Sequence, residues 1–244
     1  MKNGLKILFL FCLPLYLFAV EAPYLGVPSE TNLCLYKAGF SIGYSYKYRQ
    51  AVWVAYTLTS DNLSAKQFRR KDRFSVDPEI KFYPVHPRDY RNSGYDKGHL
   101  APAADMTYSI NSMNDSFLMS NISPQIPGCN RGIWKRLENQ VRKWAIKEKR
   151  LYIITGPIFT PPTEVITNTA IPIPTAFYKV VLDLTPPMKM IGFIVPNQTS
   201  KRRVVSFAVC VDQVEQITGY DFFNELDDKL EKQLEQSCDI SLWF

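Results

Sequence analysis

The segment YRNSGYDKGHLAPAADM, residues 90–106, contains His99, one of two histidines in the chain. Gly98 precedes this histidine and permits a backbone turn that a Cβ atom would resist. Pro102 follows it and prevents a helix from continuing through the segment. We therefore expect a short polar bend between two β-like stretches.

His99 is suited to taking a proton from water, because the unperturbed pKa of histidine lies closest to neutrality among the side chains. Asp96 is the acidic neighbour that would orient its ring. An isolated histidine in a loop is more often structural, so the assignment depends on the rest of the sequence. His86 lies between prolines in YPVHPRDY, without an acidic partner or metal-ligand spacing, and we assign it a structural role.

The block MSNISPQIPGCNRGIWKRLENQVRKWA, residues 119–145, predicts a helix from Asn130 to about Lys149. Apolar residues recur there at three- and four-residue spacing, at Ile133, Leu137, Val141 and Trp144. Asn130 and Glu138 border the same side of this stripe on a helical wheel. Each has an ordinary structural alternative, Asn130 as the helix N-cap and Glu138 as the i,i+4 partner of Arg142.

Apolar runs bounded by Gly or Pro predict the strands of a central sheet. They cover residues 51–59, 151–159, 176–184 and 188–197. VDQVEQITG predicts a short helix that stops at Gly219, and a further amphipathic helix follows it. The expected fold class is α+β.

DKGHLAPAADM, residues 96–106, is similar to the DRGH signature of the DNA/RNA non-specific endonucleases. SNISPQ and the residues Asn130, Trp134, Leu137 and Glu138 resemble the N-x-x-x-W-x-x-L-E helix start of the same family. Further matches follow in order as TGPIF, PTAFYKVV, VPN and VEQITGYDFF, so the resemblance covers nearly the whole chain after residue 22. The family includes secreted sugar-non-specific bacterial nucleases and mitochondrial endonuclease G.

The resemblance implies a central antiparallel sheet flanked by helices. Within it, residues 90–106 and the Asn130 helix would form a ββα-metal, or His-Me finger, active-site motif. The implied activity is Mg²⁺-dependent, sequence-non-specific hydrolysis of phosphodiester bonds in DNA and RNA, with Mn²⁺ as a substitute ion. The products would carry 5′-phosphate and 3′-hydroxyl ends.

The resemblance also implies roles for individual residues. His99 would be the general base, Asn130 the protein ligand of the metal, and Glu138 the residue that holds metal-bound water. Asp96 would be a structural hydrogen-bonding residue rather than a ligand.

Phosphate would be contacted and stabilised by cationic side chains, for which the candidates are Lys97, Arg69, Arg70 and Arg73. Lys97 stands where the family usually has an arginine. The sequence does not separate Arg70 from Arg73 as the residue nearest the scissile phosphate.

The net charge of +6 and the pI near 9.0 agree with a phosphate-binding surface, although alone they are weak indicators. Two other function classes remain open from the sequence. One is a non-catalytic nucleic-acid-binding protein that keeps the nuclease fold, and the other is a phosphodiesterase of different substrate range. The preference between DNA and RNA, a homodimer and an inhibitor protein are also left open.

Residues 1–22 have the pattern of a signal peptide, since Lys2 and Lys6 precede an apolar run over residues 7–20. The run is short for a membrane span of about 20 residues. We expect cleavage near Ala19 or Ala22, with a retained membrane anchor as the alternative. Residues 23–244 would then form a single endonuclease domain, exported to the periplasm or secreted and without stable membrane association.

Four cysteines follow the leader, Cys34, Cys129, Cys210 and Cys238. Export would allow disulfides to persist, and the sequence permits three connectivities. A Cys210–Cys238 bridge is one expectation, and a buried free thiol at Cys210 is the alternative.

Overall fold

The computed structural model describes residues 26, 28–29, 31–65, 67–70, 72–237 and 239–244. The expected leader, residues 1–22, lies outside the described residues, as does Cys238. Within the described part of the chain, no helix is long and apolar enough to span a membrane.

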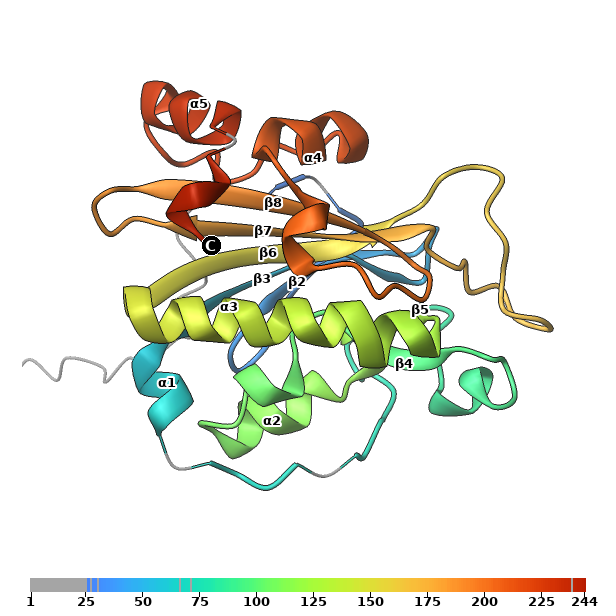
Figure 1. The fold of residues 1–244 in the computed structure, drawn as a ribbon. Helices are drawn as coiled ribbons and strands as arrows, with labels where there is room; N and C mark the ends of the chain where they lie inside the picture. Colours follow the sequence, from blue (N-terminus) through green and yellow to red (C-terminus); the bar gives the residue numbers. More distant parts are fainter. Residues whose placement is uncertain (1–25, 27, 30, 66, 71, 238) are drawn as a thin grey trace, which may run out of the picture.

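A seven-stranded sheet of order β1-β2-β3-β6-β7-β8-β9 runs through the centre of the molecule, and each neighbouring pair is antiparallel (Figure 1). Its strands are β1 (Leu33–Tyr36), β2 (Ser41–Ser45), β3 (Gln50–Thr59), β6 (Arg150–Ile158), β7 (Ala176–Asp183), β8 (Lys189–Pro196) and β9 (Ala208–Val209). The four strands predicted from the sequence correspond to β3, β6, β7 and β8. Both of their faces are apolar because helices cover the sheet on both sides.

Helix α3 (Lys135–Glu148) lies on one face of the sheet, while α4 (Val211–Thr218) and α5 (Asp228–Gln236) lie on the other (Figure 1). The predicted apolar stripe of α3 is buried in the first interface, with Ile133, Leu137, Val141 and Trp144 all in that core. The second interface buries Val211 and Val214 of α4 with Leu234 of α5. These layers confirm the expected α+β class.

Within residues 90–106, turns and bends occur before and after residues 96–99, but the residues around Gly98 themselves form a strand where a bend was expected. Strand β4 (Asp96–His99) pairs antiparallel with β5 (Ile122–Gln125), so that His99 lies opposite Ile122. The expectation was wrong for Gly98, because packing rather than a turn requires glycine there: a Cβ atom would collide with the side chain of Gln125. The β4–β5 pair is followed by α3, which gives the expected ββα arrangement.

The remaining elements are short and connect these layers. They are α1 (Ser60–Ser64), α2 (Ile110–Ser116), the π turn Cys129–Trp134, and the 3-10 turns Pro87–Tyr90, Ala103–Asp105, Met119–Asn121, Val204–Phe207 and Ile240–Leu242. His86 lies at the start of one of these turns, where its backbone N–H donates to Asp89, and it does not line the catalytic cavity described below.

Gly219 adopts a φ of 71° directly after α4, which agrees with its predicted role as the helix stop. Cys210, at the start of the same helix, is disulfide-bonded, and its expected partner Cys238 lies outside the described residues. Cys34 and Cys129 are free thiols.

Candidate active site

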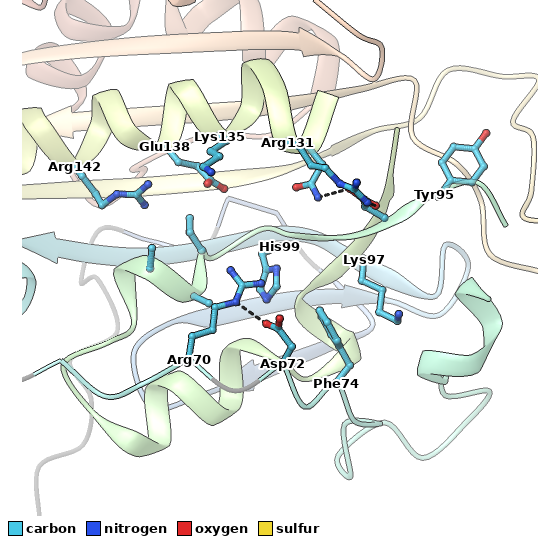
Figure 2. A pocket seen from close by; sticks show the side chains of 15 residues that line it. Arg70, Asp72, Phe74, Tyr95, Lys97, His99, Arg131, Lys135, Glu138 and Arg142 are labelled. Carbon is cyan, nitrogen blue, oxygen red and sulfur yellow. Dashed lines mark hydrogen bonds and ion pairs between the residues drawn. The ribbon is translucent and has the colours of Figure 1, made fainter. Parts of the chain in front are cut away.

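A cavity of about 570 Å³ lies between β4, the segment around Arg70 and the beginning of α3. In Figure 2, Glu138 and Lys135 extend from α3 on one side, and His99 and Arg70 lie on the other. The cavity is lined by segments that are distant in the sequence. Pairing of β4 with β5 brings His99 close to the beginning of α3.

The cavity brings together five of the residues predicted from the sequence: Arg70, Lys97, His99, Asn130 and Glu138. Strand alternation explains the pair Lys97 and His99, whose side chains share one face of β4 while Gly98 faces Gln125. Arg69 and Arg73 are exposed and do not line this cavity.

His99 is half-buried against the rings of Phe74 and Phe117, with ring centroids 5.5 Å and 5.0 Å away. Burial lowers the pKa of His99 to about 3, the positive charge of Arg70 acts in the same direction, and Asp72 opposes both. The imidazole is therefore neutral near pH 7. The same burial makes the free ring a weaker base than a solvated histidine. Its Nε2 atom is enclosed without a hydrogen-bond partner, which leaves Nδ1 as the nitrogen that can meet water in the cavity.

Asp96 does not orient the His99 ring, contrary to the expectation from the sequence. Its Oδ2 accepts hydrogen bonds from Asn130 Nδ2 at 2.9 Å and from Arg131 Nε at 2.8 Å. Burial alone would raise the pKa of Asp96, but the hydrogen bonds from Arg131 and Asn130 outweigh it, and the pKa lies below its usual range. Asp96 is thus an ionised acceptor for the metal-ligand candidate, in agreement with its expected structural role.

The contact with Asp96 fixes the orientation of the Asn130 amide. An ionised carboxylate only accepts hydrogen bonds, so the nitrogen of the amide must face Asp96 and the oxygen must point elsewhere. The N-cap alternative for Asn130 is wrong, because the π turn begins after Gly128 and the Asn130 side chain is committed to Asp96. The turn is interrupted at Gly132, whose φ of −104° and ψ of −107° are not helical, so Asn130 lies before a kink rather than on the regular helix.

Glu138 lies in the first turn of α3 and lines the same cavity. Burial raises the pKa of Glu138 to about 7, Lys179 offsets part of that effect, and Asp105 adds to it. The alternative pairing with Arg142 does not occur, because Arg142 Nη1 donates to Asp105 Oδ1 and Arg142 Nη2 to Asn139.

Lys179 on β7 is a charged group beneath the site that the sequence did not reveal. It is fully buried, its Nζ has no hydrogen-bond partner, and it lies 5.0 Å from the ring centroid of Trp134 and 5.8 Å from that of Tyr56. Burial lowers the pKa of Lys179 to about 8, and the charges of Glu138 and Asp105 oppose that shift. The available signal was a lysine inside the apolar run AFYKVVL.

The residues of the cavity fit a hard divalent ion. An amide oxygen at Asn130 and a carboxylate at Glu138 are the oxygen ligands that Mg²⁺ prefers, and Mg²⁺ commonly keeps several waters in place of further protein ligands. Across the described residues, clusters of three or more His, Cys, Asp or Glu close enough to hold an ion occur at α4 and α5 rather than here. The donor set therefore suits an open ion site rather than a closed structural cage.

Comparison with known proteins identifies close relatives across most of the chain. The sequence profile described as DNA/RNA non-specific endonuclease matches residues 21–229. A nuclease of Syncephalastrum racemosum is 34% identical over 227 residues, which cover 83% of this chain and 71% of that protein. Mitochondrial endonuclease G of Caenorhabditis elegans is 35% identical over 222 residues, covering 84% of this chain and 72% of the relative.

A solved structure has a similar fold. It is described as the crystal structure of the EndoG/EndoGI complex, with the mechanism of EndoG inhibition. The matched chain is 29% identical, has a TM-score of 0.79, and is aligned over 84% of this chain and 91% of its own length.

Proposed function

The chain belongs to the DNA/RNA non-specific endonuclease family and is a nuclease, a hydrolase of nucleic acid, and we propose that His99 is its general base and Asn130 its metal ligand. The observation that carries this proposal is the position of His99, Asn130 and Glu138 around one cavity. A neutral imidazole has one nitrogen free to accept a proton.

In the proposed step, His99 Nδ1 accepts a proton from a water molecule as the water oxygen attacks phosphorus. The bond between phosphorus and the 3′ oxygen breaks, and that oxygen takes up a proton from solvent. The products are a 5′-phosphate and a 3′-hydroxyl. The enclosed Nε2 atom would carry the other ring proton throughout the attack. The rings of Phe74 and Phe117 pack against the imidazole and would hold it in position.

We propose Mg²⁺ as the ion, with Mn²⁺ as a substitute, bound through the Asn130 amide oxygen. Its support is the hydrogen bond between Asn130 Nδ2 and Asp96, which directs the amide nitrogen away from the cation. When bound, the ion would neutralise the negative charge that develops on the leaving 3′ oxygen. Glu138 would accept hydrogen bonds from water near Asn130 and so keep that water ordered.

Lys97 and Arg70 are the proposed phosphate contacts. Lys97 Nζ lies 5.1 Å from the ring centroid of Phe74, and Arg70 lies over the ring of Phe117 at 5.4 Å, so both cations are held beside His99 by aromatic groups. Arg70 also pairs with Asp72 at 2.6 Å. The pair is exposed and therefore weak, so a phosphate can compete for the guanidinium.

The substrate is nucleic acid, and both DNA and RNA are proposed, because the cavity offers cations for the backbone that the two polymers share. We also propose export of the chain, on the leader expected at residues 1–22. Two of the relatives are mitochondrial, so the alternative is that residues 1–22 direct the chain to mitochondria. Microscopy of a fluorescent fusion distinguishes these destinations.

The decisive experiment is digestion of plasmid DNA and of RNA by the purified chain in Mg²⁺ and in chelator. His99→Ala should lose about a thousandfold in rate while it still binds DNA, in keeping with the usual contribution of a general base. His86→Ala is the matched control, since it removes the only other histidine, and should cleave at nearly the wild-type rate. Equal rates for the two variants would refute the assignment.

A further inference from the structure

A side cavity of about 250 Å³ adjoins the catalytic cavity, and Tyr95 lines both of them. Tyr95 directly precedes β4, the strand that carries His99. Figure 2 shows Tyr95 and Arg142 at opposite ends of the catalytic cavity, with His99 between them. A nucleic-acid strand bound beside His99 can therefore continue past Tyr95 into the side cavity. Besides Tyr95, the lining of the side cavity includes Ile126, Glu164, Ile173, Pro174 and Asn197.

Asn197 holds together three segments that form the walls of the side cavity. Its Nδ2 donates to the carbonyl oxygens of Pro124 at 3.1 Å and Pro174 at 2.9 Å. Its Oδ1 accepts from the backbone N–H of Ile126 at 2.9 Å. These bonds join the end of β5, the segment before β7 and the residue that follows β8. The VPN motif at the end of β8 therefore has a role in shaping this cavity.

Tyr95 presents an aromatic surface at the junction of the two cavities. The side chain is half-buried and packs against the cluster that contains Ile122 and Ile171, so it is supported from one side. In the described part of the chain no other ring stacks on it, and its hydroxyl has no hydrogen-bond partner. Ile126 and Ile173 add apolar walls to the side cavity. A ring that is supported behind and borders a cavity in front is a platform on which a flat heterocycle can stack.

The charge and size of the side cavity suit a base rather than a phosphate. Glu164 is exposed at its rim, and its carboxylate has no ion pair or hydrogen bond with the other described residues. This negative charge repels phosphate, whereas Arg70 and Lys97 in the catalytic cavity attract it. Pockets that enclose drug-sized molecules have volumes of about 300–1,000 Å³, so a smaller cavity suits a single heterocycle.

We propose that the side cavity is a nucleobase subsite, in which a base next to the scissile phosphate leaves the stack of its strand and lies against the ring of Tyr95. The inference rests on the proposed catalytic role of His99. Tyr95 recognises the face of the base, so the subsite accepts purines and pyrimidines alike. A paired base must first be separated from its partner, which costs free energy, so the subsite favours single-stranded substrate.

The test is calorimetric binding of two single-stranded phosphorothioate trinucleotides, which keep the backbone charge and resist cleavage. One carries three bases and the other is abasic throughout. Wild type should bind the first at least tenfold more tightly, in keeping with the contribution of base–aromatic stacking. Tyr95→Leu keeps apolar packing but removes the ring, and its preference should fall below about threefold. Tyr95→Phe should behave as wild type, because the hydroxyl is not used.

Tyr36→Leu is the matched control, since Tyr36 is a 68% exposed tyrosine on β1 that lines neither cavity. Its preference for bases should equal that of wild type. Equal binding of both trinucleotides by wild type contradicts the proposal, and so does an unchanged preference in Tyr95→Leu. Because each protein is compared with itself, a partly unfolded variant changes the amount of active protein rather than the ratio of affinities.

Cleavage gives a second readout. The ratio of kcat/KM for single-stranded over duplex DNA of one sequence should fall at least fivefold in Tyr95→Leu and stay unchanged in Tyr95→Phe. An equal loss on both substrates would mean that Tyr95 supports the fold or the phosphate, and the proposal would be wrong. His99→Ala separates the two claims, because it should lose cleavage and keep the preference for bases. Retained cleavage in His99→Ala refutes the general base alone, whereas equal trinucleotide affinities in wild type refute the subsite alone.

Discussion

Asn130 Nδ2 donates a hydrogen bond of 2.9 Å to Asp96 Oδ2, across 34 residues of sequence. The bond joins the first residue of β4 to the π turn before α3, and it determines which end of the Asn130 amide is free. Asp96 would therefore act on the proposed metal through Asn130, without being a ligand itself.

Replacing Asp96 should consequently change the metal dependence of cleavage. We predict that Asp96→Ala raises the Mg²⁺ concentration for half-maximal rate by about tenfold or more, the usual effect of losing a residue that orients a ligand. A Mg²⁺ titration of plasmid cleavage measures this. Arg131→Gln is the control, because Arg131 binds the same carboxylate but its side chain is 72% exposed and its ion pair weak. Identical Mg²⁺ curves for Asp96→Ala and wild type would show that Asn130 needs no such support.

Arg70 and Arg73 should behave differently, although the sequence does not distinguish them. Only Arg70 of the two lines the cavity. We predict that Arg70→Ala loses about two orders of magnitude in kcat, as expected for a donor to the transition state. Arg73→Ala should stay within a few-fold of wild type. The reverse order in single-turnover cleavage would assign the phosphate contact to Arg73.

The low pKa of His99 predicts an acid-sensitive fold. The ordinary pKa is 6.5 and the folded-state pKa is about 3, so the unfolded chain binds the proton first as pH falls. Stability is therefore complete above pH 6.5 and is lost progressively between pH 6.5 and 3. Relative to His99→Gln, wild type should lose up to about 1.4 kcal/mol per pH unit in that window. Urea unfolding of both proteins at pH 7, 6 and 5 tests this, and parallel losses would mean that His99 is not desolvated.

The lysine at position 97 makes a prediction about geometry. Lysine offers phosphate a compact charge, whereas arginine offers two parallel donors. Lys97→Ala should be badly impaired and Lys97→Arg active in the same cleavage assay. Lys135→Ala is a useful comparison, because this second lysine lines the cavity from α3. A fully active Lys97→Ala protein would remove Lys97 from the proposed phosphate contacts.

Removal of metal should stop cleavage without unfolding the chain at 25 °C, because the core rather than an ion at Asn130 stabilises the fold. Activity should return when Mg²⁺ is added. Asn130→Ala should be almost inactive, and Asn130→Asp should bind the ion more tightly yet turn over slowly, because the added charge reduces its Lewis acidity. Circular dichroism in chelator is the folding control. Full activity in chelator would exclude the proposed metal role.

The sequence predicts the buried stripe of the helix well, since all four of its apolar positions are buried, but α3 begins at Lys135 rather than at the predicted Asn130. Local periodicity carries that information because the period of a helix is set by neighbouring residues. Local periodicity does not predict the hydrogen-bond partners of Asp96, which depend on how β4 pairs with β5 and on the kinked turn that holds Asn130. The sequence motif marks Asp96 as a candidate functional residue but does not identify the side chains with which it forms hydrogen bonds.

Two further features of the site depend on tertiary packing and escaped prediction for that reason. Whether Arg70 or Arg73 reaches the cavity is decided by the path of an irregular segment, where no periodicity assigns a direction. The burial of Lys179 is decided by Trp134 and Tyr56, which belong to other elements. A lysine within a strand is ordinarily read as an exposed or edge residue.

Arg70, Lys97 and Lys135 are among the cationic side chains that line the catalytic cavity. Because these charges are concentrated at one place, a polyanion is attracted toward the catalytic residues before contact. Productive encounters should therefore be more frequent than the net charge of +6 alone implies.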